Sequence, residues 1–152
     1  MITLAAEGNR LKGLWFDGQR YDRASLSGPS EEKDLPVFRE TETWLDIYFS
    51  GNIPDFTPAL SLCGTPYRKE IWNILRDIPY GDTVTYKDIA DQYYLRSGRK
   101  TSPRAVGNAV GHNPVSLIVP CHRVVGSGQK LTGYAGGLER KKYLLDLEQR
   151  QK

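Results

Sequence analysis

The sequence predicts an α/β N-terminal domain over residues 1–62, a short sheet plus one helix. It also predicts a mainly α C-terminal domain over residues 63–152 that contains a helix-turn-helix. Three observations predict this class. Two short apolar runs open the chain, a segment with two prolines divides it, and the second half contains three helix starts marked by capping residues. The length of 152 residues is enough for one medium domain or two small ones.

Two strands are expected first, over residues 2–6 and 11–16, because both runs are apolar and a turn-like cluster separates them. Residues 27–34 then form a polar loop. Residues 52–61 contain Pro54 and Pro58 and are predicted to be a linker. The domain boundary is therefore placed near residue 62.

Between the polar loop and the linker, a helix is predicted to begin at Pro36 and to end before Gly51. Proline suits the first position of a helix because its missing N–H would have no partner there. The residues at near-helical spacing are Val37, Thr41, Leu45 and Tyr48.

A second helix is expected to follow Thr65, which can cap its N-terminus, with Pro66 at the first position. The segment 79–82 ends it. The residues expected to face the core are Tyr67, Ile71, Leu75 and Ile78.

Two further helices form the predicted helix-turn-helix. Thr85 and Asp88 resemble a capping box that opens the first, which extends through Tyr93, and Ser102 followed by proline opens the second. Between them we expect a long basic loop over residues 91–102. Two short capped helices joined by a turn are what a helix-turn-helix requires, although an ordinary helical pair has the same pattern.

The second helix of this pair, residues 104–110, carries unusually small side chains. Glycine destabilises a helix interior by roughly 1 kcal/mol relative to alanine, so close approach to another surface is expected to offset the loss. That surface is either another helix of the core or the groove of DNA, and the narrow minor groove suits a smooth helix. The small residues are Ala105, Gly107, Ala109 and Gly111.

Residues 138–148 are expected to form a last amphipathic helix. Its apolar face is predicted to consist of Leu138, Tyr143, Leu144 and Leu147, and its exposed face to carry Arg140, Lys141 and Lys142. The glycine-rich segments 126–129 and 133–137 precede this helix. Neither matches a phosphate-binding pattern, because no strand–GxGxxG–helix and no GKS or GKT is present.

The net charge of +3 conceals an asymmetry. Residues 1–62 contain 6 Lys or Arg and 10 Asp or Glu, a net charge of −4, whereas residues 63–152 contain 15 and 8, a net charge of +7. A basic second half favours a polyanionic partner such as nucleic acid. No apolar run of transmembrane length and no signal peptide is present, so we expect a cytoplasmic protein without a membrane partner.

Cys121 and His122 adjoin after an apolar run and are candidates for an activated thiol, since a thiol attacks as thiolate and an imidazole can accept its proton. The pairing alone is weak evidence. Cys63 and Cys121 could form a disulfide or be inert, but without an export signal we expect both to stay reduced. The two histidines and two cysteines lack zinc-site spacing, so no metal is expected.

Taken together, these motifs resemble the O6-alkylguanine-DNA alkyltransferases, over nearly all of residues 63–150. The matching segments are Thr65-Pro66 through Pro79-Tyr80-Gly81, Thr83-Val84-Thr85-Tyr86, Arg104-Ala105-Val106-Gly107, Asn113-Pro114, Pro120-Cys121-His122-Arg123-Val124, Gly133-Tyr134-Ala135-Gly136-Gly137 and residues 144–148. The resemblance implies a winged-helix-like second domain and a ribonuclease-H-like sheet in the first. Residues 1–62 resemble the family only as a short, variable α/β domain.

The resemblance also implies an activity. An alkyl group on guanine O6 in double-stranded DNA would be transferred to Cys121 in a single turnover, after the damaged nucleotide is flipped out. O4 of thymine is left open as a second target. The resemblance implies that no cofactor is needed, and we expect a monomer.

Roles follow from the resemblance residue by residue. Arg104 would take the place of the flipped base, and Tyr86 would crowd the 3′ phosphate and donate toward guanine N3. Carbonyls of Cys121 and Val124 would accept from the exocyclic amine, while Tyr134 and the N–H of Ala135 would lie near O6. The DNA- and base-binding residues are thus Tyr86, Arg104, Ala105, Gly107, Val124, Tyr134 and Ala135.

The catalytic residues implied are Cys121, His122, Glu148 and Asn113. Cys121 is the nucleophile, His122 takes the thiol proton through a water and is oriented by Glu148, and Asn113 ties the active-site loop to the helix pair. We expect His122 and Glu148 to lower the pKa of the thiol.

Two features depart from the family. The expected loop 91–102 is longer and more basic than the family suggests, which leaves its DNA contacts open. N-terminal cysteines of the kind that bind zinc in some relatives are lacking, so a regulatory second acceptor is not expected.

Three other functions would fit parts of the same sequence. The main alternative is a non-enzymatic alkyltransferase-like protein, which binds lesions but lacks the cysteine; Cys121 argues against it. A winged-helix regulator would not need the Cys-His-Glu set, and a cysteine hydrolase would turn over on esters or peptides.

Overall fold

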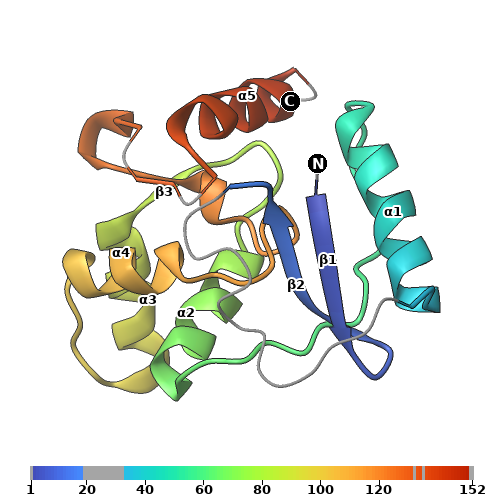
Figure 1. Ribbon diagram of the computed structural model, residues 1–152. Coiled ribbons are helices and arrows are strands. Elements are labelled where there is room, and N and C mark those ends of the chain that lie inside the picture. The colour runs from blue at the N-terminus through green and yellow to red at the C-terminus, as the bar shows by residue number, and fades with distance from the viewer. Residues whose placement is uncertain (1, 19–32, 132, 135, 151–152) are drawn as a thin grey trace.

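In the computed structural model, which describes residues 2–18, 33–131, 133–134 and 136–150, the chain begins with a β-hairpin (Figure 1). β1 (Ile2–Glu7) pairs antiparallel with β2 (Arg10–Phe16), with an irregularity between Ala5 and Ala6. Both predicted strands are confirmed, each one residue longer toward the turn. Most of the predicted loop 27–34 lies outside the described residues.

Helix α1 (Pro36–Phe49) lies along the hairpin, as Figure 1 shows, and begins and ends where predicted. The side chain of Asn9, in the hairpin turn, accepts a hydrogen bond from the N–H of Val37 (3.1 Å) and so satisfies one of the unpaired donors of the first turn. The buried residues are Val37, Thr41, Trp44 and Tyr48, whereas Leu45 is only half-buried. The predicted face is therefore correct except for a shift of one residue at its middle.

The hairpin also contacts the later part of the chain, on the side away from α1. Leu11 forms an isolated bridge with Leu60, and Leu14 forms another with Val115. Leu14, Tyr48, Trp72 and Leu144 belong to a single hydrophobic cluster that includes residues on both sides of residue 62. The division into two domains near residue 62 stays a prediction from the sequence.

Three helices follow, and their predicted caps are present. α2 (Pro66–Arg76) is capped by Thr65, whose hydroxyl accepts from the N–H of Arg68 (3.2 Å). α3 (Tyr86–Ser97) begins with the predicted capping box of Thr85 and Asp88. α4 (Pro103–Gly111) is capped by the hydroxyl of Ser102.

The expected loop over residues 91–102 is wrong in its extent. α3 continues to Ser97 and ends at Gly98, whose φ of 72° provides the left-handed residue that commonly terminates helices. The connection to α4 therefore covers only residues 98–102. Arg96 lies in the helix, outside the connecting loop, and its guanidinium binds the carboxylate of Asp77 (2.6 Å).

Two short parallel strands, β3 (Val84–Thr85) and β4 (Val124–Val125), pair beside α3 and were not predicted. The 3₁₀ turn η1 (Cys121–Arg123) leads into β4, and a second one, η2 (Ser127–Gln129), follows. This pairing places the residue before Tyr86 next to the segment that follows Cys121.

The last helix, α5 (Leu138–Gln149), lies across the end of the molecule near the N-terminal end of the hairpin (Figure 1). Its predicted faces need correction. Lys141 is completely buried together with Leu144, Leu147 and Glu148, while Leu138 and Tyr143 are about half-exposed. Lys141 precedes Leu144 by three residues and Glu148 by seven, so it lies on the buried face of the helix.

The observed architecture is mixed α/β, as predicted. No helix among the described residues is long and apolar enough to cross a membrane.

Candidate active site

The segment between α4 and Cys121 is held in shape by one buried amide. The side-chain oxygen of Asn113 accepts from the N–H of Val115 (3.0 Å), and its Nδ2 donates to the carbonyl of Val119 (2.8 Å). A single side chain thus joins the two ends of the turn that precedes Cys121. This geometry agrees with the position predicted for Asn113, between the helix pair and the active-site loop.

Strand β2 supports the same turn from the other side. The N–H of Leu14 donates to the carbonyl of Pro114 (2.9 Å), and the N–H of Ser116 donates back to the carbonyl of Leu14 (3.1 Å). Backbone from the first part of the chain therefore fixes the loop that carries the candidate nucleophile.

Two tight turns follow in the segment that leads to Cys121. The N–H of Ile118 donates to the carbonyl of Ser116 (2.9 Å) around Leu117, whose φ of 71° is positive although its side chain is almost fully buried. The N–H of Cys121 donates to the carbonyl of Val119 (2.8 Å) around Pro120. Both are γ-turns, and the one at Leu117 has the strained, rare form.

Cys121 is buried, with 4% of its surface exposed. Burial raises its pKa, because a thiolate loses water there, and the hydrogen bond from Asn113 and the charge of Lys141 oppose this only in part. The expected lowering of the thiol pKa is therefore wrong for the protein at rest. The thiol is protonated until a base removes its proton.

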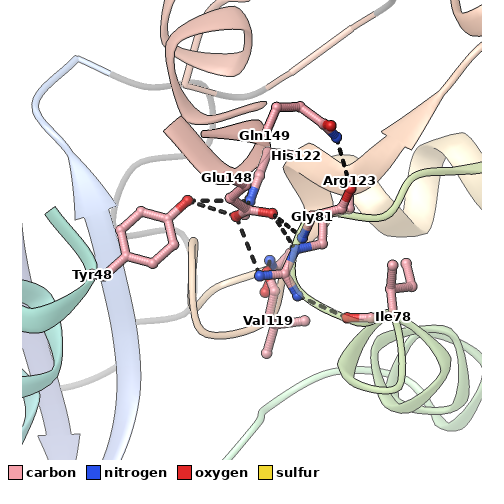
Figure 2. A network of polar contacts seen from close by, with 9 residues as sticks. Tyr48, Ile78, Gly81, Val119, His122, Arg123, Glu148 and Gln149 are labelled. Atoms are coloured by element: carbon pink, nitrogen blue, oxygen red, sulfur yellow. Dashed lines mark hydrogen bonds and ion pairs between the residues drawn. The ribbon is translucent and has the colours of Figure 1, made fainter. Parts of the chain in front are cut away.

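His122 is the residue predicted to be that base, and the hydrogen bond to its partner defines its tautomer. Its Nε2 donates to Oε2 of Glu148 at 2.5 Å (Figure 2), so in the neutral ring Nδ1 carries the lone pair. Nδ1 is buried and has no hydrogen-bond partner within the described residues. Burial lowers the pKa of His122 against the pull of Glu148, which keeps the ring neutral and able to accept a proton.

Glu148 is the centre of the network in Figure 2. Arg123 donates to it from Nε (2.8 Å) and Nη2 (3.2 Å), and the N–H of Gly81 donates to Oε1 (3.2 Å). Burial raises the pKa of this carboxyl, but the hydrogen bonds from His122 and Arg123 and the charge of Arg123 outweigh burial and lower it to about 2. Glu148 is thus ionised at any physiological pH.

Sequence reasoning missed three members of this environment. Arg123 was noticed only as part of the Pro-Cys-His-Arg run, yet its guanidinium binds Glu148 and the carbonyl of Ile78 (2.7 Å). Tyr48 was assigned to the core of α1, yet its hydroxyl donates to Oε2 of Glu148 (2.6 Å). Lys141 was predicted to be exposed; the helical spacing to Glu148 was the signal that could have found it.

The buried Lys141 acts on the thiol electrostatically. Burial lowers the pKa of Lys141 to about 8, and the interaction with Cys121 counteracts this shift. Below that pH the ammonium stabilises the Cys121 thiolate, since opposite charges in a poorly solvated site interact strongly.

A pocket of about 710 Å³ opens in front of Cys121. Its wall brings together five predicted residues, Tyr86, Arg104, Gly107, Cys121 and Tyr134, which come from α3, α4, η1 and the loop before α5. His122, Glu148 and Asn113 lie behind this wall, while Ala105 and Val124 are not part of it. Ala135 lies outside the described residues. His112 also contributes to the wall and was not predicted to do so.

The small residues of α4 have two different surroundings. Ala109 is buried and its carbonyl accepts from Nε1 of Trp72 (2.9 Å), which is the core contact. Gly107 lies in the pocket wall, where an added Cβ would meet the ring of Tyr86 at 3.7 Å. Arg104 is exposed in the first turn of this helix, at the rim of the same pocket.

Within the described residues, no group of three or more His, Cys, Asp or Glu side chains could hold a metal ion. Cys63 is an exposed free cysteine, and Cys121 is a buried free cysteine.

The chain is similar to proteins of one family. The family model described as 6-O-methylguanine DNA methyltransferase, DNA binding domain, matches residues 66–150. A methylated-DNA–protein-cysteine methyltransferase of Mycobacterium bovis is 43% identical over 150 residues, covering 97% of this chain and 85% of that protein. One of Methanosarcina acetivorans is 48% identical over 148 residues, covering 97% and 90%.

Solved structures show the same likeness. A crystal structure of Mycobacterium tuberculosis OGT in complex with DNA matches with a TM-score of 0.85 and 41% identity, over 99% of this chain and 87% of that one. The structure of an O6-methylguanine DNA methyltransferase from Methanococcus jannaschii matches with a TM-score of 0.69 and 32% identity, over 97% and 87%.

Proposed function

Since the chain belongs to the 6-O-methylguanine DNA methyltransferase family, we propose that it repairs DNA by transferring an alkyl group from guanine O6 to its own Cys121. The activity is that of a methylated-DNA–protein-cysteine methyltransferase. The observation that supports the assignment to Cys121 is its position in the pocket wall, with the His122–Glu148 pair directly behind it. Cys63, which is exposed, does not line that pocket.

The chemical step balances in atoms and charge. The Cys121 sulfur forms a bond to the alkyl carbon while the bond from that carbon to O6 breaks, and the electron pair stays on the guanine. The thiol proton passes to Nδ1 of His122 through a water, and Glu148 stabilises the resulting imidazolium. The guanine anion takes up a proton from solvent, to which His122 returns the thiol proton, and it stays in the DNA strand as the normal base. The product on Cys121 is a thioether, which has no ready leaving group, so each molecule acts once.

Because the thiol is buried, its deprotonation depends on His122. A thiolate formed in advance would be poorly solvated at this site, which is why the pKa of Cys121 is raised. Proton removal therefore belongs to the reaction itself, when His122 gains a charge beside Glu148. Lys141 adds a positive charge near the sulfur as that charge develops.

The pocket residues are proposed to act on the flipped nucleotide. Tyr86 donates toward guanine N3, Tyr134 lies near O6, and the backbone carbonyls of Cys121 and Val124 accept from the exocyclic amine. Burial raises the pKa of Tyr134 well above its usual value, so its hydroxyl remains a donor. Donors placed where charge develops on the leaving base stabilise the transition state.

We propose that DNA lies across α3 and α4 as on a helix-turn-helix, with Ala105 and Gly107 of α4 against the minor groove. Arg104, exposed at the rim of the pocket, would fill the gap left by the flipped base, because a guanidinium stacks on bases and hydrogen-bonds to the orphaned partner. The ribonuclease-H-like and winged-helix-like classes, a monomeric state and a cytoplasmic location, where thiols stay reduced, are proposals of the same kind.

The direct test is mass spectrometry after mixing the protein with duplex DNA that contains O6-methylguanine. We expect a gain of one methyl group, located on Cys121 by peptide mapping, with one methyl transferred per protein molecule. A protein that binds this DNA tightly and gains no mass would instead be a non-enzymatic lesion-binding relative. Turnover beyond one equivalent would contradict the thioether product.

Replacement of Arg104 by alanine should separate flipping from chemistry. We expect repair of O6-methylguanine in duplex DNA to fall much more than the reaction with free O6-benzylguanine, because only the duplex requires an extruded nucleotide to be held out. The measurement is a pair of single-turnover rates for each protein. Equal losses on both substrates would show that Arg104 serves the pocket or the fold.

Binding of the basic second half to DNA should depend strongly on salt and little on sequence, since most contacts go to phosphates. If about four to six phosphates are neutralised, log K should fall against log salt with a slope of roughly −4 to −5. Arg99 and Lys100 are exposed in the short connection before α4. Their joint replacement by alanine should flatten the slope by up to about two units.

A matched control for this titration removes two exposed charges from α5 and its end, by the double replacement of Lys142 and Arg150 with alanine. Both variants lose the same formal charge, so only local contacts distinguish them. A slope that changes equally in both, or in neither, would mean that residues 98–102 do not face DNA.

A further inference from the structure

Tyr48 connects the first part of the chain to the catalytic network. It projects from α1, its side chain is completely buried, and its hydroxyl lies 2.6 Å from Oε2 of Glu148 and 3.5 Å from Nε2 of His122 (Figure 2). A carboxylate can only accept, so the tyrosine donates. Burial and the charge of Glu148 raise the pKa of Tyr48, which keeps its hydroxyl protonated at every physiological pH.

We propose that Tyr48 is a positioning residue for alkyl transfer, whose hydroxyl sets the orientation and the electron density of Glu148 and thereby the basicity of His122. This inference deepens the proposed function and rests on it. It assigns the first 62 residues an indirect part in the chemistry, through a residue that touches neither the base nor the sulfur.

The ring of Tyr48 is fixed by aromatic packing on several sides. It stacks on Trp44 with ring centroids 5.3 Å apart and nearly parallel planes, and it meets the rings of Tyr80 and His122 edge-on at 6.0 and 6.4 Å. Trp44 belongs to α1, whereas Tyr80 and His122 belong to the second half. The hydroxyl therefore has little freedom to leave Glu148, and the nearly complete burial of Glu148 and His122 leaves water poorly placed to replace it.

The bonding of Glu148 shows why one hydroxyl matters. Oε1 is held by Nε of Arg123 and the N–H of Gly81, while Oε2 accepts from Tyr48, His122 and, at the longer distance of 3.2 Å, Nη2 of Arg123. Tyr48 and His122 thus share one oxygen. Without the hydroxyl, that oxygen is less constrained and its negative charge is less dispersed.

Loss of the Tyr48 hydroxyl should raise the pKa of His122. A carboxylate that loses one donor attracts the Nε2 proton more strongly, which favours the imidazolium and raises the pKa of His122. The charged or titratable groups around the ring are Glu148 and Lys141 on α5, its neighbours Cys121 and Arg123, and Tyr48 on α1. Replacement of Tyr48 changes only the last of these directly.

The experiment compares Tyr48→Phe with the matched variant Tyr80→Phe. The ring of Tyr80 packs edge-on against the ring of Tyr48. The hydroxyl of Tyr80 is buried but has no hydrogen-bond partner within the described residues. For each protein we would measure the single-turnover transfer rate at saturating O6-methylguanine duplex from acid to alkaline pH, the affinity for that duplex, thermal unfolding, and the His122 titration by nitrogen NMR without DNA.

For Tyr48→Phe we expect transfer at neutral pH to slow about tenfold, because Glu148 is less well oriented and a larger share of His122 is already protonated. This loss is smaller than the roughly 10²- to 10⁴-fold expected for loss of the base itself. Affinity for DNA should not change, and the acid limb of the rate profile and the His122 titration should both move to higher pH. Tyr80→Phe should resemble the unmodified protein in all four measurements. Equal behaviour of the two variants, or slower transfer without any movement of the His122 titration, would overturn the proposal.

If Tyr48→Phe does not fold, 3-fluorotyrosine at position 48 keeps the ring and makes the hydroxyl a stronger donor. The His122 titration should then move to lower pH, and an unmoved titration would overturn the proposal. The NMR measurement needs no substrate. It therefore tests Tyr48 even if the unmodified protein transferred no alkyl group, a result that would refute the proposed function alone.

Discussion

Replacement of Cys121 by serine should abolish alkyl transfer while leaving the binding of alkylated DNA intact. The hydroxyl is nearly the size of the thiol but is a far weaker acid and nucleophile, and His122 cannot ionise it at neutral pH. Because Cys121 occupies only one part of a pocket whose other walls come from α3, α4 and the loop before α5, the shape that receives the base is preserved. The measurement is methyl incorporation by mass spectrometry together with duplex affinity.

Cys63→Ser is the matched control, since Cys63 is exposed and does not line the pocket. It should transfer one methyl at the unmodified rate. Transfer retained in Cys121→Ser, or lost only in Cys63→Ser, would refute Cys121 as the acceptor.

His122→Ala should slow transfer by roughly 10²- to 10⁴-fold at neutral pH, the range for loss of an acid–base partner. The effect is expected to be large because burial raises the pKa of the Cys121 thiol, so little thiolate exists without a base. The measurement is the single-turnover rate with saturating duplex, alongside the affinity for DNA, which should not change.

The same variant should recover part of its rate as the pH rises, since hydroxide then removes the thiol proton. Because the pKa of Cys121 is raised, the rate should recover only above the pH at which an ordinary thiol ionises. Recovery should be incomplete, because Lys141 has a pKa of about 8 and loses the charge that stabilises the thiolate over the same range. A variant that transfers at the unmodified rate at pH 7 would contradict the role of His122.

Local signals in the sequence predicted the helices well. Thr65, Thr85 and Ser102 each cap a helix through the side-chain hydrogen bond that their residue type favours, which is a property of a few neighbouring residues. The end of α3 was misplaced because basic residues after Tyr93 were interpreted as a loop, whereas Gly98 was the actual stop signal. The strands β3 and β4 were missed because two residues are too few for any periodicity.

The site was predictable only where a motif was contiguous. Cys121 and His122 are adjacent in the sequence, and the resemblance to a family pointed to Glu148. Tyr48 lies 100 residues before Glu148, and its hydrogen bond to that carboxylate depends on how α1 packs against the later helices. No local pattern contains that information.

The turn at Leu117 restricts which residues can replace this leucine. A φ of 71° suits glycine, and holding a leucine there costs on the order of 1–3 kcal/mol. The side chain is nevertheless 1% exposed, and burying a leucine stabilises by roughly 1.5–3 kcal/mol. Glycine would relieve the backbone and empty the core, a β-branched residue would worsen the strain, and asparagine would bury an amide that needs new partners. None of these replacements satisfies both demands, so Leu117 is hard to replace although it carries no reactive group.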